Sequence, residues 1–321
     1  MFSKSPLVSV LINNYNYGQF LDAAIASALN QTYPHTQVIV VDDGSTDCSP
    51  EIIAHYGDRI ISILKENGGQ ASALNAGFAA SQGEIICLLD ADDLFLPNKV
   101  AEVVDLFQAQ PNINWVFHES MASQSTEIIN TETSTLFKKA AQETVHHPSQ
   151  TVDFRDNILK AQVPDFTPST SNLCFSRELS ERIFPLPEVK GFSGAAINDF
   201  YIKYVAVGLE TGCTSKRNLG IFRMHSSNAF STQGFTRKRK VYAEMYIVTA
   251  YWMRVKFPQF SKLSQKLFAK GLATYFKSKG DDLDYHKVIC QYFSIASYPE
   301  KFAVGWKSMY YFIKLGFTSL V

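Results

Sequence analysis

A set of apolar runs in the first hundred residues limits the folds that this chain can adopt, and three of these runs end in polar or acidic clusters. Apolar and β-branched residues predict strands in LVSVLIN, TQVIVVDDGS, RIISILKE and GEIICLLDADD, and helical spacing separates these strands in QFLDAAIASALNQ, SPEIIAHYGD and QASALNAGFAAS. Strands that are apolar throughout and separated by helices predict a parallel sheet covered by helices on both faces.

Polar residues gather directly after three of these predicted strands. The clusters are Asn13 to Tyr17, Asp42 to Asp47 and Asp90 to Asp93. Sheets of this kind bind ligands beyond the carboxyl ends of their strands, where the loops leave the sheet. We therefore expect a binding site at that edge.

The rest of the chain divides by pattern. A helix is predicted over 97–111 and a strand over 113–120, whereas 122–150 is polar and aperiodic, as in a mobile loop or a small excursion. A strand, helices and a further strand are expected between 169 and 225. From about residue 236 the pattern is helical and rich in aromatic residues.

Composition and charge exclude several classes of function. Among 321 residues, 30 basic and 30 acidic side chains give a formal net charge of zero, which offers no support for a nucleic-acid partner. The five cysteines show no C-x-x-C spacing, which disfavours a disulfide framework or a zinc site and fits a reducing cytoplasm. No signal-peptide pattern occurs, and no apolar stretch reaches the ~18–20 residues of a membrane span. A soluble or peripheral protein is expected.

Two acidic motifs each allow two interpretations. In VVDDGSTD, a carboxylate beside Gly44 either belongs to a turn and helix cap, with Ser45 or Thr46 as the cap, or accepts a hydrogen bond from a nucleobase or ribose. In LLDADDLF, the acids either cap a helix that begins near Leu96, with Asp93 as the cap, or point together toward Mg²⁺ or Mn²⁺. The position of the second motif after a buried strand favours the cation.

In combination these motifs resemble the family 2 glycosyltransferases, inverting enzymes of the GT-A fold that use nucleotide sugars. The resemblance covers roughly residues 6–230 and rests on VSVLINNYNYGQFLDAAIASALNQTY, IVVDDGSTD, ENGGQASALNAGFAASQGEIICLLDADD, IND and FRMHSSNAFS. It implies a Rossmann-like α/β domain over 1–235, with a mixed, mostly parallel sheet flanked by helices. Within it, 1–115 would be the nucleotide-binding half and 116–235 the acceptor half. Residues 236–321 would form a C-terminal helical extension.

The resemblance assigns the diphosphate side of the site to four residues. Asp92, the second acid of the D-x-D, would bind the metal, and Asp90, the first, would face the ribose or sugar. His225 would be a further metal ligand or a diphosphate donor, although a lone histidine after a strand is also explained by a structural role. Arg223 would bind a phosphate through its planar guanidinium.

The base side of the implied nucleotide site follows from two loops. Tyr15 would pack against the base, although an ordinary surface turn also explains it. Asp43 is preferred to Asp42 as the acid that bonds the base, and Asn75 is equally explained by packing. Asn67 and Gly69 match a loop that lies along the nucleotide, where small residues suit a close approach of the backbone. Asn13 is the remaining nucleotide-binding position.

Asp199 is the candidate catalytic base. GAAINDFYIKY matches the place where the family usually has Glu-Asp at a helix start, but here Asn198 replaces the first acid. Helix capping is the competing role of Asp199. The helix dipole would favour its carboxylate, so its pKa need not be high.

The implied reaction is a single displacement with inversion. Asp199 would accept the proton of an acceptor hydroxyl as that oxygen attacks the anomeric carbon, with Mg²⁺ or Mn²⁺ on the donor diphosphate. Prevalence in the family favours a UDP-sugar donor, and the acceptor would be a glycan or a lipid-linked saccharide.

A sugar-phosphate nucleotidyltransferase is disfavoured, because NNYNYGQF has one glycine and no basic residue. A non-catalytic nucleotide- or glycan-binding module stays open, supported only by Asn198.

Two features of the C-terminal part stay open between structural and binding roles. The basic run TRKRK at 236–240 is either a solvated helix start or a contact for an acceptor phosphate or acidic lipid headgroups. The last helices, in which Lys301, Lys307 and Lys314 punctuate apolar residues, fit either a cover for the sheet or a peripheral contact with the inner face of a membrane. His146 and His147 have no partners at ligand spacing and are assigned no role.

Overall fold

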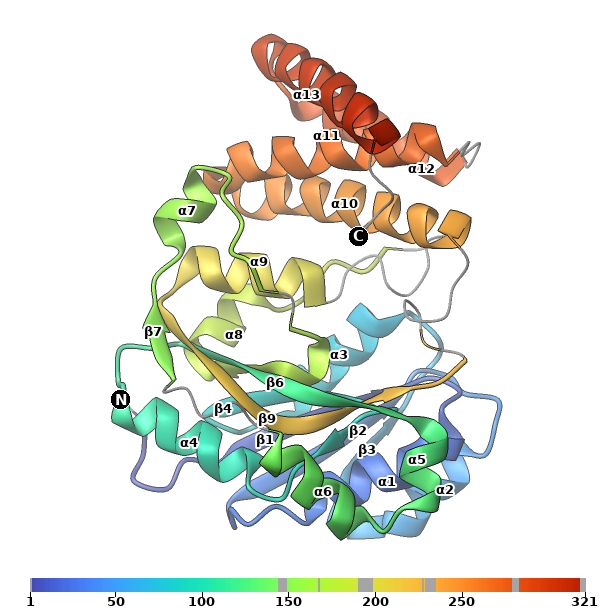
Figure 1. The fold of residues 1–321 in the computed structure, drawn as a ribbon, viewed down its shortest axis with the longest axis vertical. Helices are drawn as coiled ribbons and strands as arrows, with labels where there is room; N and C mark the ends of the chain where they lie inside the picture. Colours follow the sequence, from blue (N-terminus) through green and yellow to red (C-terminus); the bar gives the residue numbers. More distant parts are fainter. Residues whose placement is uncertain are drawn as a thin grey trace. The chain divides into compact units, whose positions relative to one another are not determined.

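The protein is described by a computed structural model that covers residues 2–143, 149–166, 168–189, 199–226, 228, 235–278 and 283–317. The chain divides into two compact units, which are described separately (Figure 1). The first unit comprises Met1–Asp153, Phe166–Leu186 and Leu209–Ser226, and the second comprises Phe154–Asp165, Pro187–Gly208 and Ser227–Val321.

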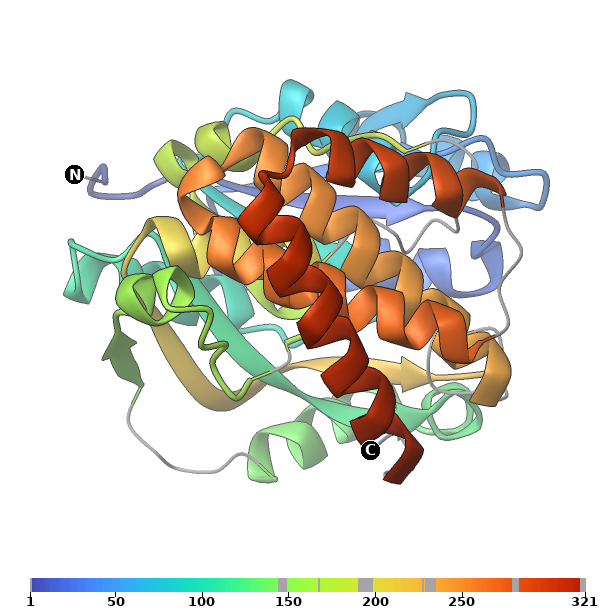
Figure 2. The same ribbon diagram turned by 90° about the horizontal axis from the view of Figure 1, so that it is seen from above.

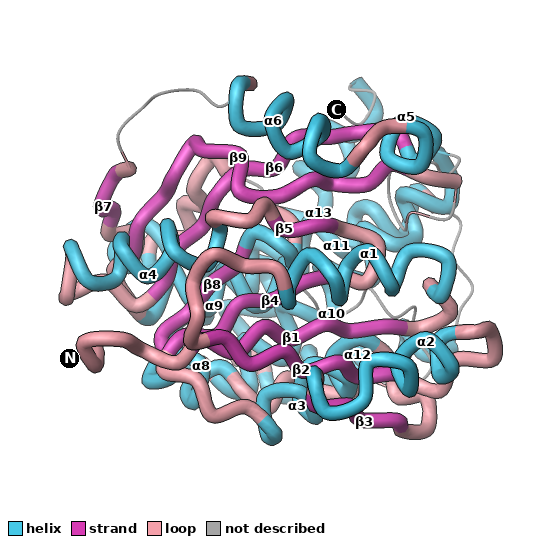
Figure 3. Tube along the Cα trace, turned by 90° about the horizontal axis from the view of Figure 1, so that it is seen from below, coloured by secondary structure: helices cyan, strands magenta, loops and turns pink. Residues whose placement is uncertain are grey.

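The first unit is built on one mixed sheet, whose strands lie side by side in Figure 3. The strand order is β3-β2-β1-β4-β8-β6-β9-β5, with β7 paired to β9. The longest ladders, β6 with β9 and β1 with β2 and β4, are parallel, whereas β8 is antiparallel to both its neighbours. The strands are β1 (Val8–Asn14), β2 (Thr36–Asp42), β3 (Ile61–Leu64), β4 (Ile85–Asp90), β5 (Leu94–Phe95), β6 (Trp115–Gln124), β7 (Gln150–Val152), β8 (Leu173–Ser176) and β9 (Gly212–Met224).

Helices cover both faces of this sheet, because strand side chains alternate between the two faces. Val10 and Ile12 of β1 pack in one buried core with Leu21 of α1 (Gly18–Leu29), and α2 (Ser49–Tyr56) and α4 (Lys99–Ala109) contribute to the same core. On the other face, α3 (Gln70–Ala80) approaches closely at Gly77, where an added Cβ would lie 3.3 Å from Val41. The predicted α/β fold with a mixed sheet flanked by helices is confirmed. Shorter helices are η1 (Gly57–Arg59), η2 (Thr170–Asn172) and α8 (Arg177–Ile183).

The polar segment from residue 122 onward is more ordered than its composition suggests. β6 continues to Gln124, and α5 (Ser125–Asn130) and α6 (Thr133–Gln142) follow it. Leu136 and Ala140 are buried in a small second core with Ile128 and Met121. Of the two interpretations of this segment, residues 122–143 fit the small excursion and not the mobile loop, because two apolar residues at helical spacing suffice to dock α6. His146 and His147 lie outside the described residues.

The second unit is helical. It contains α7 (Arg155–Leu159), α9 (Asp199–Leu209) except for its last residue, α10 (Phe235–Lys256), η3 (Pro258–Phe260), α11 (Ser261–Lys277), α12 (Leu283–Ile295) and α13 (Tyr298–Phe317). α11 packs against α10 and α13, and α13 is the darkest red helix of Figure 2, beside the label C. The helical pattern predicted after residue 236 is confirmed, and the basic run at 236–240 lies at the start of α10. A domain boundary at residue 235 stays a prediction.

The core of the second unit joins segments from separate parts of the sequence. Phe268 of α11 stacks on Tyr292 of α12 with ring centroids 3.6 Å apart. A Cβ added to Gly208 would lie 2.7 Å from Phe260 and 2.9 Å from Ile158, so α7 and α9 meet the later helices there. Among the helices that the structure describes, none has the length and apolar character needed to cross a membrane.

Candidate functional site

Strand register brings the three polar clusters to one edge of the sheet in the first unit. Asn13 of β1 pairs with Asp90 of β4, and Asn14 pairs with Asp42 of β2. These strands are parallel, so their carboxyl ends share an edge. The clusters therefore meet where the sequence predicted a binding site.

The acids that follow β4 form a compact group. One carboxylate oxygen from each of Asp90, Asp92 and Asp93 lies within 4.8 Å of the others. Oδ1 of Asp90 accepts a hydrogen bond from Nε2 of Gln70 at 2.9 Å, and Oδ2 of Asp92 lies 3.0 Å from Nε2 of His225. Carboxylate oxygens are the ligands that Mg²⁺ prefers, so the donor set fits a hard divalent cation.

Asp93 holds the loop of this cluster and does not cap the next helix. α4 begins at Lys99, with Asn98 at its N-cap. Asp93 is buried and accepts hydrogen bonds from Oγ of Ser171 at 2.6 Å and from the backbone N–H of Arg223 at 3.0 Å. Burial, followed by the charges of Asp92 and Asp90, raises the pKa of Asp93 well above its usual range. The predicted cap role is wrong, because the side chain bonds segments distant in sequence.

Lys99 stabilises the same loop through Ser171, and it was not predicted from the sequence. This lysine is fully buried, and its Nζ donates a hydrogen bond to the carbonyl oxygen of Ser171 at 2.7 Å. Its Nζ also lies 3.2 Å from the ring centroid of Phe95. The hydroxyl of Ser171 in turn accepts from the backbone N–H of Asp90 at 3.1 Å. The available signal was a lysine on the apolar face of a helix.

The end of β9 packs on the acidic cluster. The ring centroid of His225 lies 4.6 Å from that of Phe20 and 5.5 Å from that of Tyr17. Arg223 is buried, and its Nε donates to the carbonyl oxygen of Asp92 at 2.8 Å while its guanidinium lies 4.7 Å from the centre of the Phe20 ring. The structure therefore brings Asp92, Arg223 and His225 together. Arg223 bonds the main chain of the D-x-D.

Tyr17 is a second residue that sequence analysis did not assign. Burial, followed by the charges of Asp92, Asp90 and Asp93, raises the pKa of its phenol to about 12. The neutral phenol is therefore stabilised further by the negative charges of the three acids. Its place in the same loop as Tyr15 was the only available signal.

Asp43 organises the loop that precedes α3. It is buried and accepts hydrogen bonds from the backbone N–H groups of Gly68 at 3.0 Å and Gly69 at 2.7 Å, and it pairs with Nζ of Lys65 at 2.7 Å. Nδ2 of Asn67 donates to the carbonyl oxygen of Asp43 at 2.9 Å. Gly69 has a φ of 85°, a conformation that favours glycine. The predicted residues Asp43, Asn67 and Gly69 thus form one hydrogen-bonded group.

Asp42 has a local role in the neighbouring turn. Its carboxylate accepts from Nδ2 of Asn14 at 2.6 Å and from both the backbone N–H and the hydroxyl of Ser45. α2 begins at Ser49 with Cys48 at the N-cap. The turn interpretation of this motif therefore holds for Asp42. The cap interpretation is wrong for Ser45 and Thr46, because Cys48 is the N-cap residue of α2.

Two further predicted residues lie at the end of β1 and in the loop that follows it. Tyr15 is 48% exposed. Oδ1 of Asn13 is buried and has no hydrogen-bond partner among the residues that the structure describes. An unpaired buried polar atom costs about 1–3 kcal/mol, so a hydrogen bond from a ligand to this oxygen would be stabilising.

Asp199 lies in the second unit, at the first residue of α9. Its Oδ2 is 4.0 Å from Nζ of Lys203, one turn later. Burial raises the pKa of Asp199, whereas Lys203 and the backbone N–H of Phe200 oppose that shift. The dipole argument for an ordinary pKa is therefore wrong, because burial outweighs it. Asn198 lies outside the described residues.

The comparison with protein families decides the identity of this arrangement. The sequence model of the family described as "Glycosyl transferase family 2" matches residues 9–177, more than half of the chain. The chain belongs to glycosyl transferase family 2. The match contains the three clusters at the carboxyl edge, including all three acids that follow β4.

Similar proteins are named as glycosyltransferases. An uncharacterized glycosyltransferase of Nostoc sp. is 35% identical over 225 residues, which are 69% of this chain and 66% of that protein. An uncharacterized glycosyltransferase of Rickettsia typhi is 44% identical over 108 residues, 34% of each protein. This family 2 chain therefore spans about two thirds of the first relative and about a third of the second.

A solved structure shares the fold. The crystal structure of S. aureus TarS 1-349 in complex with UDP-GlcNAc superposes with a TM-score of 0.59 at 13% identity, covering 95% of this chain and 89% of that one. This likeness extends over nearly the whole family 2 chain and concerns the fold alone.

Proposed function

We propose that this protein transfers a sugar from a nucleotide-sugar donor to an acceptor hydroxyl, with inversion and with the help of Mg²⁺ or Mn²⁺. The observation that carries the proposal is the compact group of Asp90, Asp92 and Asp93 at the carboxyl edge of a family 2 sheet. A bound cation at that group would offset the charge that grows on the departing diphosphate.

On the donor side, the residues at the sheet edge would bind and orient the nucleotide. Asp92 and His225 would hold the cation, and Asp90 would face the ribose or sugar. Arg223, whose Nε donates to the carbonyl oxygen of Asp92, would bind a donor phosphate through its guanidinium. The base would lie among the remaining assigned residues, which are Asn13, Tyr15, Asp43, Asn67 and Gly69.

On the acceptor side, Asp199 would be the general base. A carboxylate works best as a base when its pKa is close to the working pH, and burial shifts the pKa of Asp199 in that direction. Asp199 would take the proton from the acceptor hydroxyl as that oxygen attacks the anomeric carbon. The catalytic domain would be 1–235, with 236–321 as its helical extension.

For the donor we propose a UDP-sugar, and for the acceptor a glycan or a lipid-linked saccharide. The fold likeness to TarS, which was solved with UDP and with UDP-GlcNAc, supports the nucleotide. The site of action would be the cytoplasm, with a peripheral contact at the inner face of the membrane through the C-terminal helices.

The test is a panel of nucleotide sugars incubated with Mn²⁺, in which the release of nucleoside diphosphate is measured. We expect one UDP-sugar to be consumed, and Asp92→Asn to abolish Mn²⁺-dependent UDP binding in calorimetry with little change in melting temperature. Asp105→Asn, an exposed acid on α4, is the matched control. Unaltered Mn²⁺-dependent affinity in Asp92→Asn would overturn the metal assignment.

A further inference from the structure

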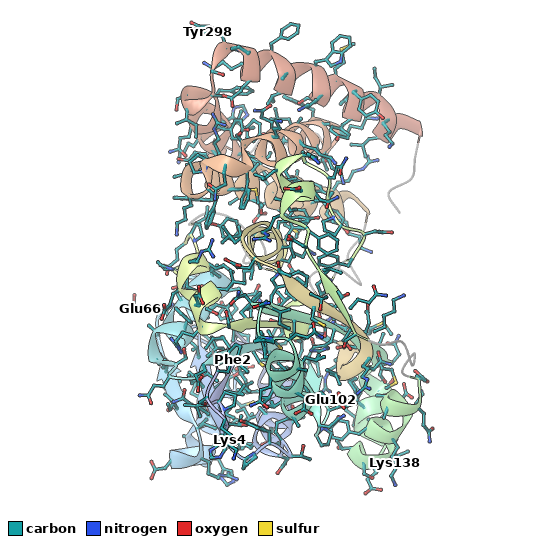
Figure 4. All side chains as sticks on the ribbon, turned by 90° about the vertical axis from the view of Figure 1, so that its left-hand side faces the viewer. Phe2, Lys4, Glu66, Glu102, Lys138 and Tyr298 are labelled. Carbon is teal, nitrogen blue, oxygen red and sulfur yellow. The ribbon has the colours of Figure 1, made fainter. Side chains whose placement is uncertain are left out.

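The outer side of α13 carries a row of large apolar side chains that remain exposed. Tyr298, Phe302, Trp306, Tyr310 and Ile313 follow one another at intervals of three or four residues and are between 51% and 88% exposed. This spacing places them on one stripe of the helix. Figure 4 shows Tyr298 at the outer side of the helix. Contiguous exposed apolar surface of this kind marks an interaction site.

The charges of α11 and α13 are almost all positive. The two helices contain the seven lysines 262, 266, 270, 277, 301, 307 and 314 and one acid, Glu300. Glu300 is already engaged, because its Oε1 lies 2.7 Å from Nη1 of Arg254. The whole chain has no net charge, so this excess is a local property of the second unit.

A pocket opens beside the apolar stripe, within the second unit. Its volume is about 410 Å³, and it is lined by Lys160, Ala161, Lys266, Trp306, Lys307, Tyr310 and Tyr311. Nζ of Lys266 donates to the carbonyl oxygen of Ala161 at 2.8 Å. Within the part of the chain that the structure describes, none of the three lining lysines forms an ion pair with a carboxylate.

The electrostatics of the pocket favour an anion. Burial, followed by the positive charges of Lys270 and Lys307, lowers the pKa of Lys266. Ammonium groups that repel one another gain from a shared negative partner, and a phosphate oxygen cluster supplies several acceptors at once.

We propose that the outer face of α13 docks on an anionic lipid bilayer, with a lipid phosphate in the pocket among Lys160, Lys266 and Lys307 and with Phe302, Trp306 and Tyr310 in the interfacial layer. Tryptophan and tyrosine favour the membrane interface, and lysine clusters are attracted to anionic lipids. A helix with an apolar stripe and basic flanks lies in the plane of the interface and does not cross the bilayer.

A second copy of the chain fits this face less well. The core of a protein interface is depleted in lysine, and a symmetric contact would bring two sets of lysines together without acids between them. The proposal deepens the membrane contact that is part of the proposed function. It uses none of the donor-site residues, so its failure would leave the transferase assay untouched.

The experiment is sedimentation of the full chain with vesicles of phosphatidylcholine alone or with about a third phosphatidylglycerol. We expect binding only to the anionic vesicles, a loss of binding in high salt, and a blue shift of tryptophan fluorescence as Trp306 leaves water. Lys266→Gln/Lys307→Gln should bind about 30-fold more weakly, because each lysine near an anionic surface strengthens binding about fivefold. Phe302→Ser/Trp306→Ser should also weaken binding.

Two controls match these variants. Lys4→Gln/Lys138→Gln removes the same charge from exposed positions of the first unit, and Ile129→Ser removes an exposed apolar side chain there. Both should bind like the parent. Equal binding to neutral vesicles, parent-like binding of the Lys266/Lys307 variant, or the same fluorescence change with millimolar inorganic phosphate alone would overturn the proposal. So would sedimentation equilibrium showing a dimer that Phe302→Ser/Trp306→Ser dissociates without a change in lipid binding.

Discussion

At the scale of single residues, Ser171 connects the acidic cluster to its buried support. Its hydroxyl donates to Asp93 and accepts from the backbone N–H of Asp90, while its carbonyl oxygen accepts from Lys99. Ser171→Ala leaves a buried carboxyl group and a backbone N–H without that partner. We expect the free energy of unfolding to fall by about 1–3 kcal/mol and Mn²⁺-dependent UDP affinity to weaken, as measured by denaturation and calorimetry.

The matched control for this prediction is Ser180→Ala. Ser180 is equally buried, but its hydroxyl donates only to the carbonyl oxygen of Ser176 within its own helix region. Its loss should lower stability without changing metal-dependent binding. If the two variants lose UDP affinity equally, Ser171 does not position the acids specifically.

At the scale of an element, α9 carries Asp199 and Lys203 on adjacent turns. Asp199→Asn keeps the shape of the side chain but removes the proton acceptor, so we expect turnover to fall at least about a hundredfold with UDP binding retained. Asp156→Asn, an exposed acid in the first turn of α7, is the control. If Asp199→Asn transfers sugar at close to the parent rate, the base lies elsewhere.

The raised pKa of Asp199 makes a separate prediction about pH. Because burial raises the folded-state pKa, the unfolded chain loses this proton first as the pH rises. As the pH rises from the pKa of Asp199 in the unfolded chain to its pKa in the folded protein, the parent therefore loses stability. Asp199→Asn has no such loss, because its side chain does not titrate. We expect the melting temperature of the variant relative to the parent to be higher at pH 8 than at pH 4. In the parent, turnover should fall as the pH drops through the raised pKa. A relative melting temperature that does not change with pH would contradict the shift.

At the scale of the whole molecule, the second unit depends on its late helices. Phe260 and Ile158 both lie against Gly208, and the ring of Phe200 lies 5.2 Å from that of Tyr246. Truncation after residue 236 removes Phe260 and Tyr246 and strips apolar cover from α7 and α9. We expect a lower soluble yield and stronger binding of a hydrophobic dye. A truncated protein with the parent's solubility and melting temperature would show that these contacts are dispensable.

Local sequence patterns predicted the α/β fold, most helices and strands, and the edge of the sheet where the polar clusters meet. These features follow from local periodicity and from the geometry of parallel strands, so the residues that specify them are neighbours in the chain. The family motifs supplied the expected roles of the acids that follow β4.

The contacts of those side chains, in contrast, follow from how distant segments pack. Asp93 binds the backbone of Arg223 from 130 positions away, His225 reaches Asp92 across 133, and Lys99 bonds Ser171 across 72. Burial and the charges of the acids raise the pKa of Tyr17, and burial raises the pKa of Asp199 despite the helix dipole. Such contacts depend on which distant segments pack together, and desolvation depends on that packing, so local sequence patterns do not contain them.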